Sequence, residues 1–215
     1  TLTQVDVSES AIQQLDCSGN RLTELNASGC GFLMNLVCGN NQLTALELAD
    51  CRRLATVDCS GNQLTALNLS ATNALLTLNC KNNRLSTLTF NSMSYPIHVD
   101  CSGNQLTELN TDTMQFTRYL DCSDNQLTRL NVRNCSVVET FSCQGNKLKE
   151  LNFSSSGKYR ALSLNAIGEG YVGYAMEQKE DGATTYTVVA TPVEGSVFQG
   201  WYTNRNCTTL VTTNS

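Results

Sequence analysis

The sequence predicts a mainly β solenoid, in which the chain winds through stacked coils that repeat one pattern. Cysteines recur every 21 residues, at Cys17, Cys38, Cys59, Cys80, Cys101, Cys122 and Cys143. Asparagines keep the same interval, at Asn20, Asn41, Asn62, Asn83, Asn104, Asn125 and Asn146. Leucines follow in step, at Leu22, Leu43, Leu64, Leu85, Leu106, Leu127 and Leu148. Such a fixed period is typical of repeat architectures, because one coil buries its apolar side chains only against its neighbours.

Each coil is expected to contain two extended segments. Residues 120–131 read Leu-Asp-Cys-Ser-Asp-Asn-Gln-Leu-Thr-Arg-Leu-Asn. The alternation Leu-x-Cys predicts a short strand with Leu and Cys facing inward. The Asn that follows suits the bend, where a buried amide can bond backbone groups that a turn leaves unpaired. The stretch Leu-x-x-Leu-x-Leu is too short for a stable helix, so it predicts a second extended segment on the opposite side.

The period also places the ends of the solenoid, which is expected to span residues 1–157. Residues 1–11 form an incomplete first coil, and the two weakest coils begin at Pro96 and Thr117, where the first Leu is lost. Pro cannot donate a ladder hydrogen bond, so an irregularity is expected at Pro96. Residues Tyr159–Leu164 match the strand pattern and predict an eighth strand. The seven full coils begin at Ile12, Leu33, Leu54, Leu75, Pro96, Thr117 and Val138.

The composition changes after residue 157, so residues 158–215 are predicted to form a second unit. Residues Tyr171–Gln178 and Thr184–Ala190 alternate as strands, and residues 179–183 between them have the composition of a hairpin turn. Residues Val197–Tyr202 predict a further strand.

The cysteine column is expected to be a buried row of thiols. Neighbouring rungs lie about 4.8 Å apart with side chains in one direction, whereas a disulfide needs a specific turned geometry. A straight row cannot surround zinc, and there is no CxxC motif, so neither a metal nor a cofactor is expected. Cys30 and Cys51 lie one rung apart, which leaves a bond between them open. Cys135 has no cysteine on a neighbouring rung, and Cys207 lies outside the solenoid.

The pattern Leu-x-x-Leu-x-Cys-x-x-Asn-x-Leu resembles the leucine-rich repeat, with Cys in one Leu position. Its 21-residue form is similar to the repeats of internalin-like bacterial surface proteins. This resemblance covers residues 1–157 and implies a right-handed leucine-rich repeat solenoid. It also implies a non-enzymatic, secreted or cell-surface adhesion module that binds a protein ligand.

A second resemblance concerns the C-terminal unit. Residues Ala190–Pro192, Gly195, Phe198 and Gly200–Tyr202 resemble the Listeria–Bacteroides repeat, which implies a small β-grasp-like module. That family has one more strand than the sequence shows before Ser215, so the module is expected to be cut short. Thr1 does not follow a Met and residues 2–8 look like half a coil, so a trimmed start is expected too.

Charge and hydropathy exclude two classes of partner. The net charge is −5, and the Lys and Arg residues are scattered, which argues against nucleic acid because that needs a clustered basic face. No run approaches the roughly 18 apolar residues of a membrane span. The expected partner is a protein or glycan ligand on a host or neighbouring cell.

Candidate ligand-binding residues lie at the outward positions beside Leu and Cys, on the expected concave face. Seven residues form the candidate set: Asp58, Asn79, His98, Asp100, Arg118, Tyr119 and Asp121, with Ile97 beside them. The coil pattern does not fix these positions, and aromatic and Arg side chains are common interface anchors.

Other interpretations of these residues stay open. The Asp of Asp-Cys-Ser recurs at four coils, so it can be part of the coil pattern, and His98 can be incidental. Asp100 and Asp121 lie one rung apart and could share a proton or a cation. Catalysis is not expected, because the face is open and no nucleophile has a base beside it. The alternatives to protein binding are a carbohydrate-binding module, for which Trp201 and Tyr202 are candidates if they do not form the module's core, and a rigid spacer.

Overall fold

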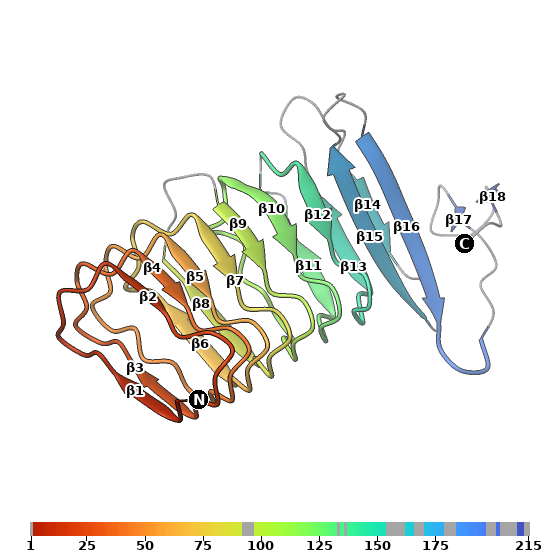
Figure 1. Cartoon of the computed structure of the whole chain (residues 1–215). Helices are drawn as coiled ribbons and strands as arrows, with labels where there is room; N and C mark the ends of the chain where they lie inside the picture. Colours follow the sequence, from red (N-terminus) through yellow and green to blue (C-terminus); the bar gives the residue numbers. More distant parts are fainter. Residues whose placement is uncertain are drawn as a thin grey trace.

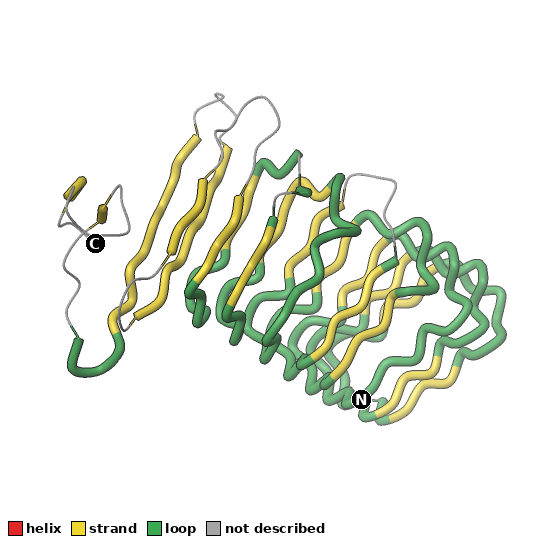
Figure 2. The backbone as a smooth tube through the Cα atoms, turned by 180° about the vertical axis from the view of Figure 1, so that it is seen from behind, coloured by secondary structure: helices red, strands yellow, loops and turns green. Residues whose placement is uncertain are grey.

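The computed structural model shows a stack of β coils that progresses from the N-terminus toward the C-terminus (Figure 1). It describes residues 2–91, 97–132, 134–135, 137–153, 162–165, 170–178, 184–196, 201–202 and 210–212. Every regular element in these ranges is a strand, and none is a helix (Figure 2). The prediction of a mainly β solenoid is therefore confirmed.

The first sheet contains one strand from each of the seven full coils. These parallel strands are β2 (Gln14–Asp16), β4 (Asn35–Val37), β5 (Thr56–Asp58), β7 (Thr77–Asn79), β9 (Ile97–Asp100), β10 (Thr117–Asp121) and β12 (Thr140–Ser142). Their register follows the sequence period, since Leu15 pairs with Leu36 and Leu36 with Val57. The strands lie side by side along the stack (Figure 1).

The second extended segment lies on the other side of the stack, as predicted, and forms a strand in most coils. The coil that contains β9 has no strand there, and the coil that contains β4 has only an isolated bridge. The strands on this side are β1 (Gln4–Asp6), β3 (Glu24–Asn26), β6 (Ala66–Leu69), β8 (Thr87–Phe90), β11 (Arg129–Asn131) and β13 (Glu150–Phe153). They pair in parallel as β1–β3, β6–β8 and β11–β13, and a single bridge joins Asn26 to Glu47.

The core consists of the inward leucine and cysteine columns. The seven leucines that follow the asparagines have no exposed area, and the seven column cysteines are at most 5% exposed. Burial of each leucine stabilises the stack by about 1.5–3 kcal/mol. The prediction of a buried thiol row is confirmed.

A ladder of asparagine side chains ties each coil to the one before it. The Asn83 Nδ2 donates to the carbonyl oxygens of Cys80 in its own coil, at 3.1 Å, and of Cys59 in the preceding coil, at 3.0 Å. The Asn83 Oδ1 accepts from the backbone N–H of Leu64 at 3.0 Å. The same bonds recur at Asn41, Asn62, Asn104, Asn125 and Asn146.

The residue before each ladder asparagine has a left-handed backbone. Glycine alternates there with Asn or Asp: the column is Gly19, Asn40, Gly61, Asn82, Gly103, Asp124 and Gly145, with φ between 52° and 66°. A Cβ added at Gly61 would lie 2.7 Å from the Asn40 Oδ1, and one at Gly103 would lie 2.5 Å from the Asn82 Oδ1. The glycines therefore leave room for the side chain of the preceding coil.

The register of the first sheet is interrupted between β9 and β10. Thr117 pairs with Ile97 and Tyr119 with His98, so Arg118 is the extra residue of a β-bulge. The irregularity expected at Pro96 falls on residues 92–96, which lie outside the described ranges. The bulge lies at the start of the coil in which Thr117 occupies the position of the first Leu.

The predicted eighth strand of the first column is wrong. Strand β14 (Leu162–Asn165) pairs antiparallel with β13, so it joins the second side of the stack rather than the first sheet. The Ser- and Gly-rich residues between β13 and β14 are typical of a reversing loop. The coil also lacks its ladder asparagine, because the sequence has Ile at position 167.

The first sheet continues into the C-terminal unit. Strand β15 (Gly170–Gln178) pairs antiparallel with β12, and β16 (Thr184–Pro192) pairs antiparallel with β15. This confirms the predicted pair of strands, whose turn at residues 179–183 lies outside the described ranges. Strands β17 (Trp201–Tyr202) and β18 (Leu210–Thr212) pair with each other. These strands do not establish a β-grasp-like arrangement, which stays a prediction, as does the division of the chain at residue 157.

We expect Asn83→Ala to lower the free energy of unfolding by about 3 kcal/mol, because it leaves a buried backbone N–H and two carbonyls without their partner. Urea unfolding followed by circular dichroism measures this change. Asn20→Ala is the control: both donor bonds of Asn20 stay within its own coil, and its Oδ1 accepts from the backbone N–H of Leu2 at an exposed site. Its loss should therefore be smaller. Equal losses at the two positions would contradict the role of the ladder.

Candidate functional site

The outer face of the first sheet carries a shallow depression of about 240 Å³ over β7, β9 and β10. Six residues line it: Thr77, Leu78, Asn79, His98, Asp100 and Tyr119. Four of the seven candidate residues therefore lie together at the depression: Asn79, His98, Asp100 and Tyr119. Asp58 and Asp121 lie on the same sheet, on the strands β5 and β10.

Two aromatic rings stand side by side at this depression. His98 and Tyr119 are paired residues of neighbouring strands, with ring centroids 6.2 Å apart and ring planes tilted by 33°. The equivalent positions of the other coils hold only Gln, Asn or Thr: Gln14, Asn35, Thr56, Thr77 and Thr140. The aromatic pair is therefore a departure from the coil pattern at one place on the face.

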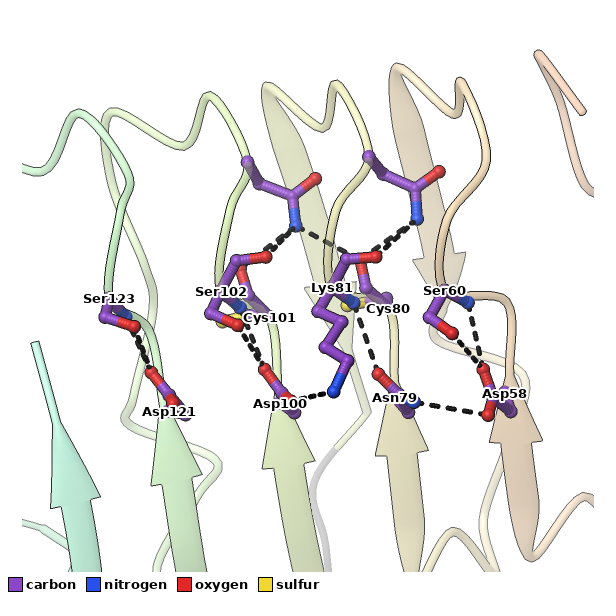
Figure 3. A network of polar contacts seen from close by, with 12 residues as sticks. Asp58, Ser60, Asn79, Cys80, Lys81, Asp100, Cys101, Ser102, Asp121 and Ser123 are labelled. Carbon is purple, nitrogen blue, oxygen red and sulfur yellow. Dashed lines mark hydrogen bonds and ion pairs between the residues drawn. The ribbon is translucent and has the colours of Figure 1, made fainter. Parts of the chain in front are cut away.

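The recurrent aspartates close the turns that follow their strands. The Asp100 Oδ1 accepts from the backbone N–H of Ser102 at 3.1 Å and from its hydroxyl at 2.6 Å (Figure 3). Asp58 and Asp121 bond Ser60 and Ser123 in the same way. Such Asx turns are a regular use of Asp and Asn. The interpretation of the aspartates as part of the coil pattern is confirmed for this oxygen.

The second carboxylate oxygen, Oδ2, differs in its partners from one aspartate to the next. The Asp58 Oδ2 accepts from the Asn79 amide at 3.2 Å, and the Asp100 Oδ2 lies 3.5 Å from the Lys81 Nζ (Figure 3). Among the described residues, no hydrogen bond or ion pair reaches the Asp121 Oδ2. Asp100 and Asp121 are paired residues of adjacent strands, as the sequence predicted. Lys81 was missed because a single lysine in a serine column carries no motif.

The phenol of Tyr119 is held in its neutral form. Partial burial raises its pKa, and the negative charges of Asp121 and Asp100 raise it further, to about 12. Tyr119 can therefore donate a hydrogen bond from its O–H at neutral pH but cannot serve as a base. The carboxylates of Asp121 and Asp100 give the surroundings of the ring a negative electrostatic potential.

Two residues that the sequence placed at the patch lie differently in the structure. Ile97 is fully buried, so its placement on the outer face is wrong: β9 begins at this residue, and the alternation of the strand turns Ile97 and Val99 toward the core. Arg118 is exposed, and its guanidinium lies 3.6 Å from the Glu139 carboxylate. It does not line the depression.

The thiols offer neither a nucleophile nor a metal site in the described part of the chain. None of its ten cysteines forms a disulfide, which answers the open question about Cys30 and Cys51. Their Sγ–H groups donate to the carbonyls of Val7 and Ala27, both at 3.0 Å. Cys207 lies outside the described ranges. No group of three or more His, Cys, Asp or Glu side chains within those ranges is arranged to hold a metal ion.

Sequence reasoning also missed a strip of exposed apolar side chains beside the first sheet. Its members are Phe32, Met34, Leu76, Phe116 and Val137. They occupy two columns that flank the first inward residue of each coil. Within each column they lie at multiples of the 21-residue period, which was a signal in the sequence. Leu76 directly precedes Thr77, which places the strip next to the depression.

Comparisons with known proteins give one structural match to report. No protein-family model matches the sequence, and no curated protein does. The chain is similar to a solved structure described as the functional domain of InlJ from Listeria monocytogenes, which includes a cysteine ladder. The identity is 28% and the TM-score 0.47, and the match covers 69% of this chain. It spans 38% of the InlJ structure, well under half of its length.

Within the described ranges, no helix has the length and apolar character needed to cross a bilayer.

The ten described cysteines should resist Ellman's reagent in the native protein at pH 8, because they are at most 5% exposed. Thiolate, which burial suppresses, is the reactive form. We expect a Cys207→Ser variant to show no fast-reacting thiol until guanidinium chloride unfolds it, after which all ten should react. Several fast thiols in the folded variant would contradict the buried ladder.

Stability should fall above pH 9. Burial raises the pKa of Cys59 from 9.0 to about 12, so its thiol ionises in the unfolded chain first. This contribution to stability is complete below pH 9 and is lost as the pH rises toward about 12, at about 1.4 kcal/mol per pH unit and thiol. Urea unfolding at pH 7 to 10.5 measures the slope. Cys59→Ala should reduce it by one thiol's share, and an unchanged slope would contradict the prediction.

Proposed function

We propose that this chain is a non-catalytic interaction module of a secreted or cell-surface protein, and that it binds a protein ligand through the outer face of its first sheet. The observation that carries the proposal is the gathering of side chains that the coil pattern does not require. His98 and Tyr119 depart from a column of Thr, Asn and Gln, and both line the depression. Lys81 departs from a column of Ser, Gly and Gln, and its ammonium reaches Asp100, which also lines the depression.

The support for this contact surface is rigid. His98 and Tyr119 lie on paired strands, and the Asx turns and asparagine bonds fix the turn that follows each strand. Side chains on a fixed backbone lose less conformational freedom on binding, so preorganisation favours affinity. Aromatic rings with a polar end are frequent anchors of protein interfaces.

The chemistry of the face favours binding over catalysis. Tyr119 keeps its proton at neutral pH, and each described thiol is buried. The depression is open and no paired nucleophile and base line it. We therefore propose no catalytic residue.

Tyr119→Ala should abolish capture of a protein ligand from solubilised surface proteins of candidate target cells, because it removes the larger ring of the depression. The assay compares, by quantitative mass spectrometry, what immobilised wild type and variants retain. Thr107→Ala, at an exposed position away from the depression, is the matched control and should retain what the wild type retains. Circular dichroism must show that both variants melt close to the wild type.

Three results would count against protein binding at this face. Identical capture by the wild type and Tyr119→Ala would place the contact elsewhere. Tyr119-dependent binding to a glycan array, without protein capture, would favour the carbohydrate-binding alternative. Absence of any ligand in both assays would favour the rigid spacer.

A further inference from the structure

We propose that the depression over β7, β9 and β10 receives the cationic end of a basic side chain of the protein ligand, with an arginine guanidinium fitting best. The group would lie beside the Tyr119 ring and bond the outer carboxylate oxygens of Asp100 and Asp121. This inference rests on the proposed function and names the chemistry of its contact.

The carboxylates on the outer face of the first sheet are unevenly spaced along the stack. On neighbouring rungs the residues that follow the inward Leu or Val are Asp58, Asn79, Asp100 and Asp121. The amide of Asn79 separates the first two carboxylates and bonds the Asp58 Oδ2 at 3.2 Å. Asp100 and Asp121 have no such spacer. Like charges directly paired on adjacent strands are destabilising, so a cation between them is favourable.

The chain itself supplies a cation to one of these two carboxylates. The Lys81 ammonium reaches the Asp100 Oδ2 at 3.5 Å from the β7 side (Figure 3). On the β10 side, no described residue provides a cation or a donor to the Asp121 Oδ2. The protein thus shows that an ammonium can sit against this row of carboxylates, and it leaves the adjoining position open.

The aromatic ring of Tyr119 borders the open position beside Asp121. Tyr119 lies next to both carboxylates in a half-buried setting, and their charges contribute to the raised pKa of its phenol. A cation close to an aromatic face gains attraction from the ring, most strongly for Arg. The ring and the carboxylates therefore favour the same kind of group.

The geometry favours a guanidinium over a metal ion. The Oδ1 atoms of Asp100 and Asp121 already accept two bonds each from Ser102 and Ser123. One outer oxygen per carboxylate remains, whereas calcium takes six to eight oxygen ligands. A guanidinium carries five N–H donors, so it can donate to one oxygen on each of two neighbouring rungs. A depression of about 240 Å³ also fits one side chain rather than a larger ligand.

The test uses two peptides that differ only in charge, acetyl-Gly-Arg-Gly-amide and acetyl-Gly-citrulline-Gly-amide. We expect the arginine peptide to shift the backbone amide NMR signals of His98, Tyr119 and Asp121, with a millimolar dissociation constant that weakens with added salt. The citrulline peptide should bind about tenfold more weakly or not at all, because it keeps the shape without the charge.

Asp121→Asn should weaken the arginine peptide by about fivefold while leaving the fold intact. Asn79 already holds the equivalent turn of the first sheet through its amide oxygen, which accepts from the backbone N–H of Lys81 at 3.4 Å, so the substitution keeps an acceptor for Ser123. Asp16→Asn is the matched control. Asp16 makes the same turn bonds to Ser18 on β2, the edge strand of the first sheet, and its change should leave the affinity unaltered.

Equal binding of the two peptides, or equal weakening by Asp16→Asn and Asp121→Asn, would overturn the inference, because either result removes the specific role of this carboxylate pair. No binding of the arginine peptide together with Tyr119-dependent protein capture would also overturn it, while the proposed function stands. Specific binding of the peptide without any protein capture would support the cation site and reject protein recognition as its use.

Discussion

The carboxamide of the ladder asparagine is the interaction on which the rest of this structure depends. One side chain bonds the carbonyl of its own cysteine, the carbonyl of the preceding coil's cysteine and a backbone N–H of the preceding coil. Each coil is thereby fixed to its neighbour by a group that is itself buried and fully paired. The strands of three or four residues would not persist alone, and the leucine and thiol columns become a continuous core only once this bond sets the stacking distance.

The period was enough to predict the strands of the first sheet, the second extended segment of most coils, the buried leucines and thiols, and the structural use of the asparagines. It could not predict features that break the period. Strand β14 matched the coil pattern, yet it reverses direction, because strand composition carries no information about whether the next pairing is parallel or antiparallel. The bulge at Arg118 depends on how the chain makes up for the missing leucine at Thr117, which is a matter of packing. The ammonium of Lys81 beside Asp100 depends on a side-chain conformation across two strands.

The aspartates of the first sheet show why template and function are hard to separate in a repeat protein. One oxygen of Asp100 closes a turn that recurs along the stack, and the other faces a depression that occurs at one place. A pattern search sees only the first use, since it is the one that repeats. The distinctive chemistry comes from neighbours that do not repeat, above all His98 and Tyr119.

The left-handed residues before the ladder asparagines are glycine in alternate coils, so the stack has a structural period of two coils. A carboxamide or carboxylate from one coil occupies the space that the next coil's glycine leaves empty, as Asn40 does over Gly61. Two coils of 21 residues therefore form one complementary pair, and the effective repeat is a 42-residue block. Duplication or loss of a single coil during evolution would bring two bulky side chains, or two glycines, into succession. A change by two coils would keep the alternation of glycine with Asn or Asp.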